Sequence, residues 1–189
     1  MPVPVNVGIT MTTDYELYES SIFQGSYFNA MLDCGREHNW WLELALKYLP
    51  EDVFDQNKER FLFTSTATRD ACRVARHYCQ TREIILLSER ILPSKYVRNE
   101  TDPKARYFIY VVLHEVAHAI RQHKSPKFDN LKNDEYEAQE KEADELAMTW
   151  FNEHVAKRNN IYLLPITKQE IEAAKTKNKN LMENTKAGI

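Results

Sequence analysis

Several features that would assign this chain to a familiar class are missing from it. Its 189 residues contain no run of about 18 apolar residues, the least a membrane-spanning helix needs, so we expect no membrane span. The start, Met1–Val5, has neither a basic region nor a continuous apolar stretch and is not typical of a secretory signal. The formal net charge is −3, which gives no indication of binding to nucleic acid or to an anionic membrane surface.

Cysteine is also scarce. Cys34, Cys72 and Cys79 show no C-x-x-C spacing, and three cysteines cannot all pair within one chain. Free buried thiols in a reducing compartment are the simplest interpretation, so we expect a cytoplasmic protein. Internal repeats and low-complexity tracts are absent, and nothing in the sequence indicates an oligomeric state.

The feature that points to a chemistry is the pentapeptide His114-Glu115-Val116-Ala117-His118. Residues four apart in a helix lie on one face, one turn from each other, so both imidazoles can bind one Zn²⁺ at about 2.0–2.1 Å. The glutamate between them lies beside that face and can act as a general base toward water. The competing interpretation is an amphipathic helix whose histidines happen to align.

The surrounding sequence predicts that this helix is buried. Thr101 or Asp102 can act as its N-cap, and Pro103 then takes the first helical position, where the missing N–H costs nothing. Residues 107–113 are all apolar or aromatic, which is typical of a helix surrounded by protein. The pattern then breaks into a polar stretch, and Pro126 stops the helix. Polar groups on such a helix need partners, and a metal ion would supply them.

A third ligand is expected, because catalytic zinc sites usually have three protein ligands. His123 does not fit the H-E-x-x-H-x-x-G-x-x-H pattern, and we interpret it as an exposed histidine at the helix end. Glu140 is the better candidate, since it points to the middle of the apolar face of a helix predicted over 133–155. The competing interpretation of Glu140 is an ion pair with a buried arginine or lysine. That apolar face contains Tyr136, Ala143, Ala147, Trp150, Phe151 and Val155.

Other acidic residues of the same helix have different expected roles. Asp144 lies one turn beyond Glu140 on nearly the same face, so it could accept the free ring N–H of a ligating histidine and fix its tautomer. Glu137, at the edge of the face, is a weaker alternative ligand. Glu142 and Glu145 point well away from the face.

These residues carry a family resemblance. H-E-x-x-H at 114–118, followed by a helical Glu140-x-x-x-Asp144, resembles the gluzincin arrangement of thermolysin-like zinc metallopeptidases. The octapeptide at 140–147, EKEADELA, is similar to the E-x-E-A-D/N-x-x-A signature of ImmA/IrrE-type peptidases. HtpX-type peptidases share that signature but carry transmembrane helices, for which this sequence has no counterpart. The resemblance covers about residues 61–150 and implies that Glu140 is the zinc ligand.

The remaining elements complete the expected fold. Residues 26–48 predict a helix with Trp40 and Trp41 in the core, 61–64 and 83–88 predict strands, and 70–79 fits a helix or a strand. Strands before the motif and helices after it predict an α+β, predominantly helical, zincin-like single domain, with a small sheet packed on the active-site helix. Residues 84–87 are the candidate for the sheet beside that helix, whose edge would bind an extended peptide.

Three segments are expected along the chain. Residues 1–20 would form an N-terminal arm or edge strand, 21–165 the metallopeptidase domain, and 166–189 a C-terminal helix and tail. The last begins with a capping box, Thr167 to Glu170, and would be docked through Ile171 and Leu181 or frayed near its end.

The function expected from these features is that of a zinc-dependent endopeptidase acting on a protein or peptide substrate. His114, His118 and Glu140 would hold one Zn²⁺ per chain, Glu115 would be the general base, and Asp144 would support a ligand histidine. Tyr162 and His154 could stabilise the oxyanion, but the spacing selects neither. The alternative is a catalytically weak or inactive zinc-binding module with a regulatory or interaction role. Its signature would be loss of the base, and Glu115 is present.

Overall fold

The fold is an α+β arrangement in which helices predominate. The computed structural model describes residues 36–57, 60–66, 71–74, 83–94, 96–97, 99–125, 129–158 and 160–186. The helices within these ranges are α1 (Arg36–Leu46), α2 (Glu51–Asn57), α4 (Pro103–Ile120), α5 (Asn133–Arg158) and α6 (Lys168–Lys186). The strands are β1 (Phe61–Thr66), β2 (Cys72–Val74) and β3 (Glu83–Ser88). The predicted N-terminal arm, residues 1–20, and the start of the helix predicted over 26–48 lie outside the described residues.

Helix α4 begins where its sequence predicts. The Asp102 carboxylate accepts hydrogen bonds from the backbone N–H groups of Lys104 and Ala105, at 2.8 and 3.3 Å, and Pro103 is the first helical residue. Twelve residues of α4 are buried, because the helix is apolar on nearly every side. An internal helix of this kind gives fixed positions to the polar residues that it carries.

The sheet has the strand order β1-β3-β2. Strand β3 pairs in parallel with β1, from Phe61 opposite Glu83 to Thr66 opposite Ser88, and antiparallel with β2. Of the segment 70–79, for which a helix or a strand was predicted, residues 72–74 form the short strand β2, and residues 70 and 75–79 lie outside the described residues. The strand predicted at 84–87 does belong to the sheet, but it lies in the centre, so the edges of the described sheet are β1 and β2.

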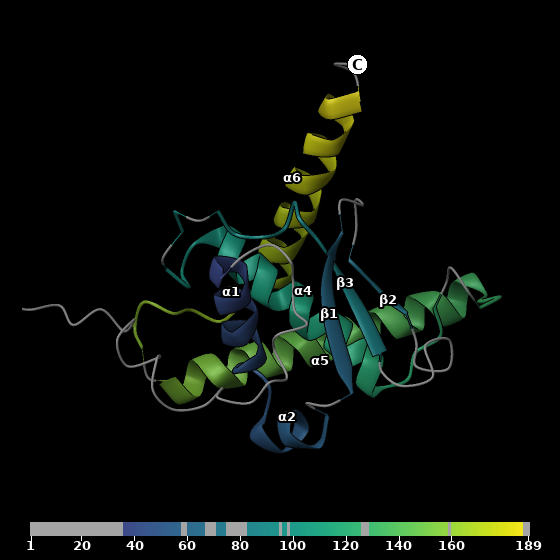
Figure 1. The fold of residues 1–189 in the computed structure, drawn as a ribbon, viewed down its shortest axis with the longest axis horizontal. Coiled ribbons are helices and arrows are strands. Elements are labelled where there is room, and N and C mark those ends of the chain that lie inside the picture. The colour runs from purple at the N-terminus through teal and green to yellow at the C-terminus, as the bar shows by residue number, and fades with distance from the viewer. Residues whose placement is uncertain are drawn as a thin grey trace, which may run out of the picture.

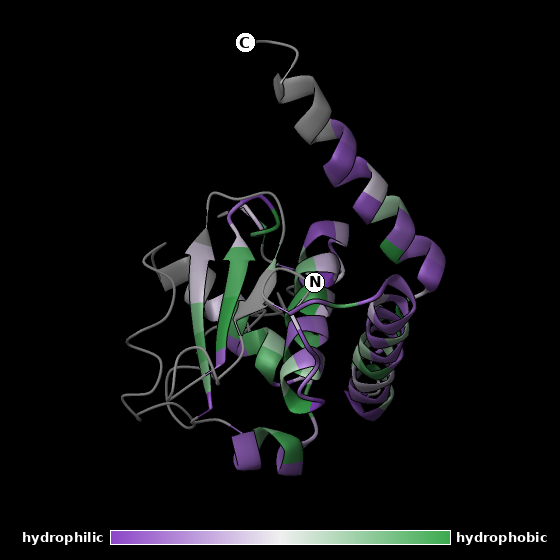
Figure 2. Ribbon diagram, turned by 90° about the vertical axis from the view of Figure 1, so that its right-hand side faces the viewer, coloured by the Kyte–Doolittle hydropathy of each residue, from purple (hydrophilic) through white to green (hydrophobic). Residues whose placement is uncertain are grey.

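Helix α4 lies at the centre of the core, in contact with α1, α5, α6, β2 and β3 (Figure 1). Figure 2 shows the apolar colouring concentrated along the sheet and the inner helices, whereas α6 is mostly hydrophilic. Trp41 is buried at the α1 side, as predicted. Tyr136, placed by the sequence on the apolar face of α5, is 39% exposed. With 26 residues against 18, α5 is longer than α4 and its first turns project past the core.

The start of α6 is anchored to α4 through a buried arginine. Arg106 pairs with both carboxylate oxygens of Glu170, at 2.6 and 3.0 Å, and donates to the backbone carbonyls of Leu164 and Pro165. Thr167 Oγ1 accepts from the N–H of Glu170 at 3.2 Å, which is one half of the predicted capping box. Ile171 is buried as expected, and the far end of the helix extends away from the body (Figure 1). The side chain of Leu181 lies outside the described residues.

Candidate metal centre

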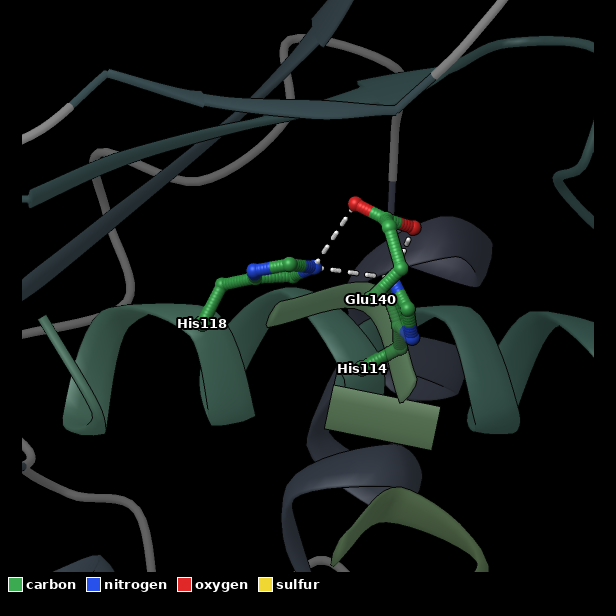
Figure 3. A group of neighbouring side chains, drawn as sticks. All are labelled: His114, His118 and Glu140. Carbon is green, nitrogen blue, oxygen red and sulfur yellow. Dashed lines mark hydrogen bonds and ion pairs between the residues drawn. The ribbon is translucent and has the colours of Figure 1, made fainter. Parts of the chain in front are cut away.

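Three side chains with metal-binding atoms converge between α4 and α5, and Figure 3 shows them pointing toward one another. Nε2 of His114 and Nε2 of His118 are 3.0 Å apart. The carboxylate of Glu140 lies 3.5 Å from the first nitrogen and 3.4 Å from the second. The described residues contain one group of this kind, with its ligand atoms all within 4.8 Å of one another. The structure therefore brings together the three residues that the sequence singled out.

The separations of these atoms suit a tetrahedral zinc ion. With bonds of about 2.0–2.1 Å, two ligands of a regular tetrahedron are about 3.3–3.4 Å apart. The observed distances of 3.0, 3.4 and 3.5 Å bracket that value. Two imidazole nitrogens and a carboxylate are also a donor set that zinc accepts. The residues present thus fit the metal.

Regular secondary structure holds all three candidate ligands. His114 and His118 are one turn apart on α4, and their side chains are each only 12% exposed. Glu140 lies on α5, which packs along α4, and its side chain is 36% exposed. Sites built on packed helices keep their geometry better than sites built on loops. One side of the group remains accessible from solvent through Glu140.

The charges at the site favour an imidazolium at His114 in the absence of metal. Burial alone would lower the pKa of His114, but the carboxylates of Asp144 and Glu140 outweigh it and raise the pKa to about 9. Burial likewise opposes the charge on Glu140, yet the two histidines hold its pKa well below the usual range. A cation is therefore favoured at this position, and a metal ion would have to displace a proton to bind.

Asp144 contacts the other nitrogen of His114. Its Oδ1 lies 2.9 Å from His114 Nδ1, a distance typical of an ion pair, although the two groups lack the alignment of a hydrogen bond. The same oxygen accepts a hydrogen bond from the hydroxyl of Tyr110, which is buried on α4 one turn before His114. Sequence reasoning missed Tyr110, although a tyrosine four residues before His114 on the same helix face was a usable signal. Lys175 of α6 approaches Asp144 Oδ2 at 3.8 Å.

Glu115 is buried, with 8% of its surface exposed. It is close enough to His114 for its charge to contribute to the raised pKa of that histidine. A carboxylate beside the ligand face, shielded from bulk water, is suited to accepting a proton from a reacting water molecule.

One prediction about a neighbouring residue was wrong, and one contact was missed. His123 is not exposed but 7% accessible, because the chain turns back after α4 and places the ring against His118. Glu142 lies off the buried face as predicted, with its side chain 50% exposed, yet its carboxylate reaches His123 Nε2 at 3.2 Å. A helix projection of α5 alone could not show this contact, because His123 comes from a different segment.

The two candidates for an oxyanion donor do not join the group. His154 follows Glu140 by fourteen residues on α5, which corresponds to about 21 Å along the helix. Its ring stacks on Tyr48 instead, with centroids 4.0 Å apart. Tyr162 lies in the connection between α5 and α6 and is 76% exposed.

Comparison with known protein families gives one match. The family model Peptidase U49 matches residues 93–178, a little under half of the chain, and this range includes α4, α5 and the metal-binding group. The match supports assignment to a peptidase family and hence a proteolytic function acting on a protein substrate. Comparisons with curated proteins and with solved structures return no match. No helix within the described ranges is both long enough and apolar enough to cross a membrane.

Proposed function

We propose that this chain is a zinc-dependent endopeptidase with a zincin-like fold, in which His114, His118 and Glu140 bind one Zn²⁺. The observation that carries the proposal is the convergence of two Nε2 atoms and a carboxylate at separations of 3.0–3.5 Å. The peptidase family match over the same helices supports it independently.

The residues of the site have separate roles in this proposal. A bound Zn²⁺ would lower the pKa of a coordinated water toward ~7 and polarise the scissile carbonyl. Glu115 accepts the proton of the attacking water and later delivers it to the leaving amine. Asp144 faces Nδ1 of His114, so that Nε2 is the nitrogen presented to the metal, and Tyr110 holds Asp144 in place.

The surroundings are suited to a polypeptide substrate. In Figure 3, strands of the sheet cross above the three ligand side chains. Strand β2 lies at an edge of the described sheet and contacts α4, so an extended peptide could add to it and pass the metal. A cavity of about 350 Å³ between α5 and α6 borders Glu140 and Asp144. Its wall includes Met148 and Ile171, and it could receive a substrate side chain.

The proposal is tested by metal content and by a broad peptide-cleavage screen on the same preparations. Wild-type protein should contain one zinc per chain, and His118→Ala should lose most of it. Glu115→Gln should keep the metal and lose cleavage. Glu153→Gln, which changes an exposed residue of α5 outside the cavity lining, is the matched control and should behave as wild type.

Each unfavourable outcome is informative. Unchanged zinc in His118→Ala would remove the site as described. Full zinc occupancy without cleavage of any peptide or protein by the wild type would favour the zinc-binding module without catalysis. Cleavage that survives complete metal removal would overturn the metallopeptidase assignment.

A further inference from the structure

We propose that His123, held by Glu142, is a positioning residue that fixes the orientation and tautomer of His118 for metal binding. This inference rests on the proposed function, because it takes His118 as a zinc ligand. The underlying juxtaposition is a row of three groups: His118 on α4, His123 in the turn after it, and Glu142 on α5.

The backbone at the end of α4 places His123 beside His118. The N–H of His123 donates to the carbonyl of His118 at 3.0 Å, and the N–H of Gln122 donates to that of Ala119 at 3.3 Å. These two bonds form a Schellman motif, in which the chain reverses over the last helical turn. Gln122 adopts a φ of 55° there, although glycine is the residue usually found at this position. The chain thus accepts a strained residue in the turn that returns His123 to the helix.

The side chains then form a continuous row of polar contacts. Nδ1 of His118 lies 2.8 Å from Nδ1 of His123, and Nε2 of His123 lies 3.2 Å from Glu142 Oε2. The other oxygen of Glu142 pairs with Arg121 at 3.0 Å, which fixes the carboxylate from the turn itself. His123 has only 6% of its side chain exposed, so water has little access to replace these partners.

The chemistry of imidazole determines which group donates and which accepts in each contact of this row. If Nε2 of neutral His118 presents its lone pair to a metal ion, its only N–H is at Nδ1, and that N–H must donate to Nδ1 of His123. His123 then carries its own proton on Nε2, where the acceptor is the carboxylate of Glu142. Both ligand histidines would in this way have Nδ1 facing an acceptor group, namely Asp144 for His114 and His123 for His118.

The decisive experiment compares His123→Phe with His123→Asn. Phenylalanine keeps an aromatic ring in the buried position but has no acceptor, whereas the Asn side-chain oxygen can take the place of Nδ1. Zinc affinity is measured by competition with a chromophoric chelator at one fixed pH. Loss of a residue that supports a metal ligand typically weakens binding by roughly 10–100-fold, which is the loss expected for His123→Phe. His123→Asn should recover most of that affinity, and Lys124→Ala, an exposed change in the same segment, should leave it unchanged.

A second measurement does not depend on zinc. The chemical shift and solvent exchange of the His118 Nδ1–H proton in the metal-free protein report its hydrogen bond to His123, which should be present in the wild type and lost in His123→Phe. Unchanged zinc affinity in His123→Phe, or an unchanged His118 Nδ1–H signal, would overturn the positioning role. Equal losses in the Phe and Asn variants would also overturn it, because packing alone would then explain the effect. Wild-type protein that takes up no zinc would instead overturn the proposed function, and the His118 Nδ1–H signal would then decide whether the contact with His123 exists.

Discussion

Replacement of Arg106 by methionine should destabilise the fold far more than the loss of any exposed ion pair. The Arg106 side chain is 7% exposed and that of Glu170 is 32% exposed. Removing one partner of a fully buried pair costs about 3–5 kcal/mol, because the other charge is left without compensation. Glu170 is near enough to solvent to recover part of its hydration, so we expect the low end, about 3 kcal/mol. The carbonyls of Leu164 and Pro165 belong to exposed residues and can bond to water.

Urea denaturation of the metal-free protein measures this loss, and thermal unfolding should show a decrease in Tm of about 6–12 °C for a chain of this size. Lys141→Met is the control, because it removes an i,i+4 pair with Glu145 whose side chains are 74% and 57% exposed. It should change the free energy of unfolding by less than about 0.5 kcal/mol. A double-mutant cycle with Glu170→Gln isolates the pair. A coupling energy below about 0.5 kcal/mol would refute the reasoning, since neighbouring charges that interact should be non-additive by more than that.

Three further results are expected. Glu115→Gln should lower turnover by roughly 10²–10⁴-fold with zinc retained, and near wild-type turnover on any cleaved substrate would exclude a general-base role. Asp144→Asn should weaken zinc binding by roughly 10–100-fold in chelator competition. Glu137→Gln should leave zinc binding unchanged. If Glu137→Gln weakened zinc binding and Asp144→Asn did not, Glu137 would be the ligand. Burial and the nearby Arg158 lower the pKa of His154 below its ordinary value of 6.5. The folded protein therefore favours neutral His154, which contributes stability at pH values above 6.5. This contribution is lost as the pH falls below 6.5. In His154→Gln, the free energy of unfolding measured in urea should therefore decrease less between about pH 7.5 and 5 than in the wild type. An equal pH dependence in the two proteins would contradict the lowered pKa of His154.

The local sequence determined the elements that carry the site. Asp102 and Pro103 set the start of α4 through backbone capping, which depends on neighbouring residues alone. The continuous apolar run at 84–87 placed β3 correctly at Glu83–Ser88, and the helical period put Glu140 on the face that packs against α4. Spacing within one helix was sufficient to pair His114 with His118.

Contacts between separate segments of the chain could not be predicted from local sequence patterns. The sequence did not give the strand order that puts β3 in the centre, because pairing of strands depends on non-local contacts. The sequence also predicted an exposed His123, which was wrong. The left-handed Gln122 and the packing of α5 return that ring to His118, and the helical period of a single segment shows neither. The choice of His114, His118 and Glu140 as candidate ligands thus depended on local periodicity. The polar groups behind them, Tyr110, His123 and Glu142, were decided by the tertiary structure, because their contacts depend on how α4, its following turn and α5 meet in space.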